Sequence, residues 1–344
     1  MTASQSSPSV VIALDLSALA LDTADGVEQL ISAAQSADVA GADLVTLDDP
    51  LTGAADGRPR LAATEAAAFV ARRTGRIGLF PATSTHYTEP FFGAKASATL
   101  DHASNGRGGV VLDPRRTDEA DRYLPNAAAL SADQLDAQAA EYAEVLRELW
   151  DSWEDDAAIR DAATSRYVDA SRIHHIHHRG QYFQVKGPLV TPRPPQGNPL
   201  VAVRTEPGAH GLSSPLLVAR ADIVIVQFSA GDSAAPAVAA SAAGVDAVVG
   251  AGPDALTSLL ASGATVLARV AASSVDAIVA EVQSRLTQGF HGVEVIITEP
   301  LQGDIPTLLA ALGARPTGAT PAPSPLFRER LGRPHIPSRY ASNT

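Results

Sequence analysis

Short, nearly continuous apolar segments recur along the chain, and this repetition is the strongest constraint on its fold. Each segment is rich in Val, Ile or Leu and is followed by a turn and a stretch with helical spacing. Runs of this kind are typical of parallel strands that are buried on both faces. The nine candidate strands are Val10–Leu14, Asp43–Leu47, Arg76–Phe80, Gly108–Leu112, Pro199–Val203, Asp222–Val226, Asp246–Gly250, Thr265–Arg269 and Val293–Ile297.

The alternation of strand and helix patterns predicts an α/β fold with a parallel sheet. A TIM barrel and an open doubly wound sheet both hold a similar number of strands. The 344 residues suit eight βα units plus an insertion, and no G-x-G-x-x-G follows the first strand, so we predict a (β/α)8 TIM barrel. Nine candidates exceed the eight strands of such a barrel, so either Asp246–Gly250 or Thr265–Arg269 is not a barrel strand. We predict that Asp246–Gly250 is the one outside the barrel. The helices are expected at Val27–Ala40, Ala62–Arg73, Pro90–Ala103, Leu135–Trp150 and Val275–Thr287.

One stretch interrupts the regular pattern. Residues 151–198 begin with the acidic DSWEDDA, continue through RIHHIHHRG and end in the proline-rich PLVTPRPPQG. Prolines end regular structure, so we predict an insertion between barrel units four and five. We expect a single TIM-barrel domain over residues 1–344, with residues 313–344 forming a C-terminal wrapping tail.

Charge and composition exclude several classes of function. The formal net charge is −12 and the pI is about 5.1, which argues against nucleic acid or an anionic membrane surface and favours a small-molecule partner. The absence of cysteine excludes disulfides and thiolate metal sites. We see neither a secretory signal nor a run of about 18 apolar residues, so we expect a cytoplasmic protein with no membrane segment.

Several long motifs in this sequence resemble one family of bacterial enzymes. They are RIGLFPATSTHYTEPFFGAKASATLDHASNGRGG (Arg76–Gly109), LWDSWEDDA (Leu149–Ala157), IHHIHHRGQYFQVKGPLVTPRPPQGNP (Ile173–Pro199) and LFRERLGRPHIPSRYA (Leu326–Ala341). Together they resemble the luciferase-like flavin-dependent monooxygenases, in the branch of the nitrilotriacetate and dibenzothiophene-sulfone monooxygenases. The resemblance covers about two thirds of the chain, and residues 205–264 match it poorly.

The resemblance implies a TIM barrel that uses reduced FMN from a separate flavin reductase. It also implies that one oxygen atom of O₂ is inserted into a small organic substrate. The flavin supplies this chemistry while the protein positions ring, oxygen and substrate, so we assign no catalytic residue and no metal. The substrate is not predicted, because variable loops at the barrel mouth determine specificity.

The resemblance also points to candidate cofactor-binding residues after the second and third strands. Asp49 in LDDP aligns with the family's flavin-contacting acidic residue, although it could equally end the strand or cap the next turn. After the third strand, Ala82 stands where the family has a flavin-contacting Thr. The missing hydroxyl is either lost or supplied by Thr83, and Ser84 follows at the same mouth.

Other flavin-contacting positions of the family are substituted in this chain. The family's phosphate-binding stretch after the fifth strand corresponds to VRTEPGAHG, where Glu206 replaces a Ser and Arg204 could partly compensate. Val111 replaces a polar Asn. A His and a Tyr of the family fall on Ala132 and Asp136.

These substitutions leave three hypotheses open. The first is a reduced-FMN-dependent monooxygenase that acts on an unknown small organic substrate. The second is a homologue without flavin that serves as the partner subunit of an active monooxygenase. The third is a deazaflavin-dependent oxidoreductase. We expect a homo-oligomer or a heterodimer with a homologue.

The histidine-rich RIHHIHHRG (Arg172–Gly180) invites a metal-site interpretation, because imidazole is a common ligand of transition metals. In an extended strand, His174 and His178 share one face while His175 and His177 share the other. Histidines divided in this way do not converge on one ion, and no carboxylate or cysteine in the stretch completes a ligand set. We therefore predict a hairpin outside the barrel without a metal.

Overall fold

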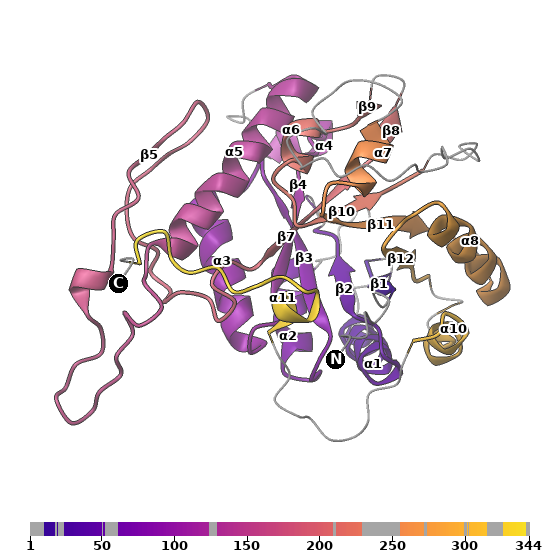
Figure 1. The fold of residues 1–344 in the computed structure, drawn as a ribbon, viewed down its shortest axis with the longest axis horizontal. Helices are drawn as coiled ribbons and strands as arrows, with labels where there is room; N and C mark the ends of the chain where they lie inside the picture. Colours follow the sequence, from indigo (N-terminus) through magenta and orange to yellow (C-terminus); the bar gives the residue numbers. More distant parts are fainter. Residues whose placement is uncertain are drawn as a thin grey trace, which may run out of the picture.

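A computed structural model describes most of the chain as one parallel barrel with its surrounding helices (Figure 1). The described residues are 10–17, 19, 24–49, 51, 61–123, 129–208, 211–228, 255–271, 274–298, 301, 303–314 and 326–341.

Eight parallel strands close the barrel in the order β1-β12-β11-β10-β7-β4-β3-β2. Closure is made where β1 pairs with β12 in the register Val11↔Gly292 through Asp15↔Ile296. The strands are β1 (Val11–Asp15), β2 (Leu44–Leu47), β3 (Gly78–Ser84), β4 (Gly109–Asp113), β7 (Leu200–Thr205), β10 (Ile223–Val226), β11 (Thr265–Val270) and β12 (Gly292–Ile296). The predicted TIM barrel is therefore confirmed.

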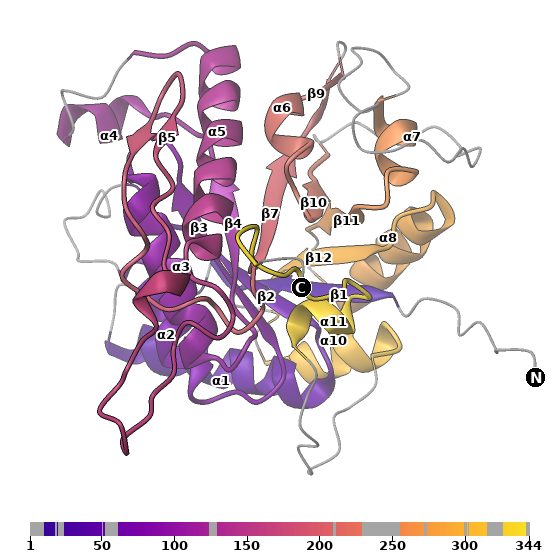
Figure 2. The same ribbon diagram turned by 60° about the vertical axis from the view of Figure 1, so that its left-hand side comes forward.

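Helices surround the strands, as Figure 2 shows from a second side. They are α1 (Ala24–Ala40), α2 (Ala63–Ala71), α3 (Pro90–Ala103), α4 (Asp118–Tyr123), α5 (Ala132–Asp151), α6 (Pro215–Val218), α7 (Ala255–Leu260), α8 (Val275–Thr287), α10 (Ile305–Ala311) and α11 (Phe327–Arg330). Local sequence explains the start of the longest of them. Ser131 and Gln134 form a reciprocal capping box at the beginning of α5.

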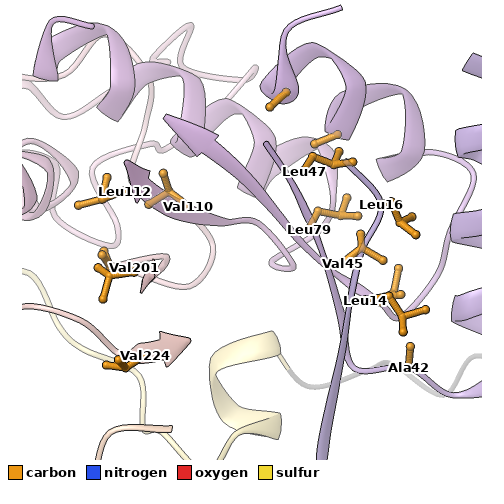
Figure 3. Close-up of a cluster of buried hydrophobic side chains, with 14 of the residues drawn as sticks. Leu14, Leu16, Ala42, Val45, Leu47, Leu79, Val110, Leu112, Val201 and Val224 are labelled. Atoms are coloured by element: carbon orange, nitrogen blue, oxygen red, sulfur yellow. The ribbon is translucent and has the colours of Figure 1, made fainter. Parts of the chain in front are cut away.

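Alternation along each strand divides the core into two layers. Residues that face outward pack under the helices, and Figure 3 shows Leu14, Val45, Leu79 and Val110 among them. Residues that face inward form a separate cluster, which consists of Val11, Ala13, Leu44, Phe80, Ala82, Val111, Leu200, Ala202, Ile223, Ile225, Leu267 and Phe327.

Phe327 is the one member of the inner cluster that does not come from a strand. Its ring packs edge-on against Phe80 with centroids 5.5 Å apart, and it lies over Gly78 at the start of β3. A Cβ atom on Gly78 would approach the Phe327 ring to 2.7 Å, so glycine makes room for the ring. The C-terminal segment Leu326–Ala341 thus contributes a side chain that fills the N-terminal end of the barrel.

Residues 151–198, which were predicted to be an insertion, lie between β4 and β7. This segment leaves the end of α5 and forms a short hairpin in which β5 (His178–Arg179) pairs with β6 (Gln184–Val185). In Figure 1 this segment extends to the left of α3 and α5, away from the strands of the barrel. A second small hairpin, β8 (Pro207–Gly208) with β9 (Gly211–Leu212), follows the fifth barrel strand β7.

Two details of the strand prediction can be compared with the structure. Thr265–Arg269 lies in β11, a barrel strand, whereas Asp246–Gly250 lies outside the described residues. The predicted end of the third strand at Phe80 was wrong, because β3 continues through Pro81 to Ser84. Pro81, which has no backbone N–H, pairs in register with Leu47.

Candidate active site at the C-terminal end of the barrel

Charged side chains replace the apolar filling at the C-terminal end of the barrel, where TIM-barrel enzymes place their active sites. Glu294 of β12 is fully buried at their centre. Its two carboxylate oxygens are bound by Arg204 of β7 at 3.1 Å and by Arg269 of β11 at 2.7 Å. One carboxylate therefore links two arginines from different strands of the barrel.

Three further side chains complete this network. Thr46 of β2 donates a hydrogen bond of 2.7 Å to Glu294. Asp15 of β1 is ion-paired with Arg269, and Asp48 after β2 is ion-paired with Arg204. We call the six residues the mouth cluster: Asp15, Thr46, Asp48, Arg204, Arg269 and Glu294.

Burial and charge together set the protonation of the mouth cluster. Burial, followed by the nearby Glu294 carboxylate, raises the pKa of Asp15 above its ordinary value. Burial opposes the charge on Arg204, but Glu294, Asp48 and Asp15 outweigh it and raise the pKa of that guanidinium. The cluster places three carboxylates against two guanidinium groups.

More carboxylates lie beside the mouth cluster. Burial, with Glu65 and Asp113 adding smaller effects, raises the pKa of Asp49 to about 6. Asp113 at the end of β4 is bound by the Arg115 guanidinium, whose Nη2 lies 2.6 Å from Oδ2. Carboxylates therefore outnumber cations on this side of the barrel mouth.

The raised pKa of Asp49 predicts a pH-dependent effect of Asp49→Asn. The folded state holds the proton of Asp49 more tightly than the unfolded chain does, so its contribution to stability is present below pH 3.8 and lost as pH rises to about 6. We expect Asp49→Asn to raise the free energy of unfolding by about 1 kcal/mol near pH ~8, after allowance for solvent screening. Denaturant titrations should show the gain disappear near pH ~4; an equal gain at both pH values would contradict the assignment.

The region after β7 positions Glu206 and the start of α6. The backbone N–H of Glu206 donates to the Ser213 hydroxyl at 2.9 Å, across the β8–β9 hairpin. Helix α6 then begins at Pro215, directly after Ser213 and Ser214. The helix that follows the fifth strand thus starts at the Pro of GLSSP, whereas the sequence motif predicts the phosphate-binding stretch at VRTEPGAHG.

The carboxylate of Asp136 on α5 binds the backbone of the first turn of α6. It accepts hydrogen bonds from the backbone N–H groups of Leu216 at 2.8 Å and Leu217 at 3.0 Å. The side chain is buried, and this burial raises the pKa of Asp136. These two backbone donors at the start of α6 are therefore satisfied by a carboxylate of the chain itself.

The structure separates the predicted cofactor-binding residues. Ala82 faces into the barrel among apolar residues, and Ser84, next on the same face, accepts a hydrogen bond of 3.2 Å from the Tyr87 N–H. Thr83 lies between them on the opposite face of β3, so its hydroxyl cannot stand in for one at position 82. Arg204 belongs to the mouth cluster, Asp49 lies beside it, and Glu206 is exposed.

Of the mouth cluster, sequence reasoning assigned only Arg204 to the site, and it missed Asp15, Thr46, Asp48, Arg269 and Glu294. A signal for them exists in three strands. Thr46, Arg269 and Glu294 each interrupt an otherwise apolar run. A polar residue within a strand that is buried on both faces requires a polar partner, and strands that meet in a barrel can supply it.

The histidine-rich segment packs against α5. His178 lies between Glu148 at 3.1 Å and Glu141 at 3.3 Å, both on α5. His174 binds Glu154 at 2.7 Å and stacks on Tyr340 of the C-terminal segment. His175 and His177 are exposed. The predicted division of the four histidines between two faces is confirmed.

The described residues contain neither a metal-binding cluster nor a membrane helix. No group of three or more His, Cys, Asp or Glu side chains is arranged to hold a metal ion in the described part of the chain. Among the helices that the structure describes, none is both long and apolar enough to cross a membrane.

Comparison with known proteins identifies the family. The model of the luciferase-like monooxygenase family matches residues 9–291. The chain therefore belongs to this family, and the predicted resemblance is confirmed. Its relatives include several proteins named as monooxygenases, which agrees with the predicted class of flavin-dependent oxidoreductase.

The relatives fall into two groups by coverage. N-acetyl-S-(2-succino)cysteine monooxygenase of Bacillus subtilis is 36% identical over 45% of this chain, and nitrilotriacetate monooxygenase component A of Aminobacter aminovorans is 41% identical over 39%. These matches span only 34% and 30% of the length of the two relatives. One of the subunits of pristinamycin IIA synthase, from Streptomyces pristinaespiralis, is 30% identical over 91% of both chains.

Solved structures share the fold at low sequence identity. Long-chain alkane monooxygenase superposes with a TM-score of 0.68 at 17% identity, covering 94% of this chain and 95% of the other. The oxygenating constituent of 3,6-diketocamphane monooxygenase from a plasmid of Pseudomonas putida, solved with FMN, superposes with a TM-score of 0.61 at 13% identity, covering 89% and 97%. These similarities support the barrel fold.

Proposed function

We propose that the chain is one component of a flavin-dependent monooxygenase, and that a homologous partner subunit holds the reduced flavin. The observation that carries this proposal is the mouth cluster. It places a closed network of ion pairs where an enzyme of this fold would bind its cofactor and substrate.

The residues at the C-terminal end of the barrel do not fit a flavin ring. Glu294 is fully buried and shares its two oxygens between Arg204 and Arg269. A ring that entered this space would separate buried charges from their partners. Breaking a buried ion pair costs about 3–5 kcal/mol, since the remaining charge is left without compensation.

The start of α6 does not fit the flavin phosphate either. Family members that bind a phosphate after the fifth strand use backbone N–H groups at a helix start, a general anion-binding arrangement. Here the N–H groups of Leu216 and Leu217 already bind the Asp136 carboxylate. A phosphate would have to displace a buried carboxylate of the same charge sign.

Charge adds a third obstacle. The barrel mouth and its edge hold more carboxylates than cations. The carboxylates are those of Asp15, Asp48, Glu294, Asp49 and Asp113, and the cations are Arg204, Arg269 and Arg115. Carboxylates in excess repel a dianionic phosphate at short range. A deazaflavin cofactor with phosphate groups would meet the same repulsion.

A relative that matches along nearly its whole length supports the role of partner. The pristinamycin IIA synthase chain aligns with 91% of this chain and is named as one of the subunits of an enzyme. We infer that the present chain also assembles with a second luciferase-like chain. A separate flavin reductase and a small organic substrate would then serve that partner.

Co-purification from cells that express the chain naturally tests this proposal. A tagged copy should recover a second luciferase-like chain in a one-to-one ratio, and the recovered complex should contain the bound flavin. Removal of the tagged chain from that complex should abolish substrate oxidation. Recovery of the chain alone, with full flavin-dependent oxygenation of a substrate, would overturn the proposal.

A further inference from the structure

His178 joins the insertion hairpin (residues 178–185) to helix α5 through both of its ring nitrogens. Its Nδ1 lies 3.1 Å from Oε2 of Glu148, and its Nε2 lies 3.3 Å from Oε1 of Glu141. The His178 side chain is 10% exposed, so little room remains for water to replace either carboxylate. Each nitrogen of this imidazole therefore faces a carboxylate oxygen.

This arrangement needs a protonated ring. A neutral imidazole donates from one nitrogen and carries a lone pair on the other, whereas the imidazolium ion donates from both. A neutral His178 would thus point a lone pair at one of its two carboxylates. The protonated ring instead forms two charge-assisted hydrogen bonds, which are stronger than hydrogen bonds between neutral groups.

The other charges around the ring leave the compensation of Glu141 to His178. Glu148 has a second cation, because its Oε1 lies 3.6 Å from Nη1 of Arg339, whose side chain is 41% exposed. In the described part of the chain, no Lys or Arg side chain forms an ion pair with Glu141. Protonated His178 is therefore the cation that Glu141 has beside it there.

Glu141 also holds the backbone of the insertion hairpin. Its carboxylate accepts hydrogen bonds from the backbone N–H groups of Gln181 at 2.9 Å and Phe183 at 2.8 Å. Residues 182–185 line one side of a cavity of about 540 Å³ next to the β3–α3 connection. The contact of His178 and Glu141 therefore helps to position one wall of this cavity.

We propose that protonation of His178 docks the insertion hairpin on α5, and that loss of this proton releases the hairpin. Histidine is the side chain whose ordinary charge change falls between about pH 5 and pH 8. Because the docked hairpin binds the proton more tightly than the released hairpin, docking is favoured as pH falls and is lost as pH rises. Release moves the cavity wall formed by residues 182–185. This switch does not depend on the flavin-free role proposed above.

Hydrogen exchange at the backbone amides of Tyr182 and Phe183 tests the proposal. Their protection factors, which already correct for the intrinsic effect of pH on exchange, should fall by roughly tenfold between about pH 5.5 and about pH 8.5. The amide of Leu146, which is buried within α5, reports unfolding of that helix and should keep its protection. Equal protection of the hairpin amides at both pH values would overturn the proposal.

Two variants test whether His178 is the responsible group. His178→Gln has no titrating proton, so its hairpin amides should be weakly protected at both pH values. Glu148→Gln can donate its amide to Nδ1 of a neutral ring, so it should keep the hairpin protected at about pH 8.5. His175→Gln, at an exposed histidine of the same segment, is the matched control and should respond to pH like the parent chain. A full pH response in His178→Gln would refute the role of His178.

Discussion

The Arg269→Met variant is expected to unfold with a free energy about 3–5 kcal/mol lower than that of the parent chain at neutral pH. Arg269 neutralises two carboxylates that are almost completely buried, Asp15 at 1% and Glu294 at 0% exposure. Methionine replaces the aliphatic part of the arginine side chain without its charge, so that Arg204 is the one cation left beside these carboxylates among the described residues. Denaturant titration of both proteins measures the difference.

The loss should become smaller in acid, because buried carboxylates without a cation take up protons in the folded state. The Asp15 pKa is already raised, and removal of Arg269 raises it further. Arg285→Met is the matched control: Arg285 is similarly buried, at 10% against 11%, but its partner Glu281 is 43% exposed. The control should lose about 1 kcal/mol or less. An equal loss in the two variants would mean that the mouth cluster is not a buried ion network.

The Phe327→Ala variant should lose a similar free energy of unfolding, in this case because a buried apolar side chain is removed. Phe327 is 1% exposed and fills the end of the barrel against Phe80. Truncation of a buried phenylalanine costs about 3–5 kcal/mol, since the cavity left behind closes only in part. The unfolding free energy of the purified variant measures this cost.

Ile336→Ala in the same C-terminal segment controls for simple loss of apolar area. Ile336 is 38% exposed, so we expect a loss below about 1 kcal/mol. A Phe327→Ala loss no larger than that of Ile336→Ala would show that the tail does not close the barrel.

The fold followed from the sequence because barrel strands and helices carry strong local signals. The apolar runs located all eight barrel strands within a few residues, and the predicted Pro90–Ala103 and Val275–Thr287 agree with α3 and α8. The end of β3 was predicted at Phe80, where the apolar run ends, whereas pairing with β2 and β4 extends the strand to Ser84. The pairing of β3 with its neighbouring strands, which the local sequence does not show, sets the end of this strand.

The candidate site was less predictable, because its contacts join residues far apart in the chain. Thr46 and Glu294 form one hydrogen bond although 248 positions separate them. Asp136 was recognised only as the loss of a family side chain, whereas the structure gives it a partner in α6. Ala82 was considered with Thr83 as a pair, but the alternation of β3 places them on opposite faces. These contacts exist only once the barrel has brought distant strands and helices together, so the sequence alone did not predict them.

Anaerobic titration of the purified chain with reduced FMN, followed by calorimetry, tests the central claim most directly. The mouth cluster and the Asp136 contact with α6 occupy the places that the ring and the phosphate would need. We therefore expect no saturable heat from the chain alone. Stoichiometric binding with micromolar affinity would contradict the account and identify the chain as the flavin-holding oxygenase itself.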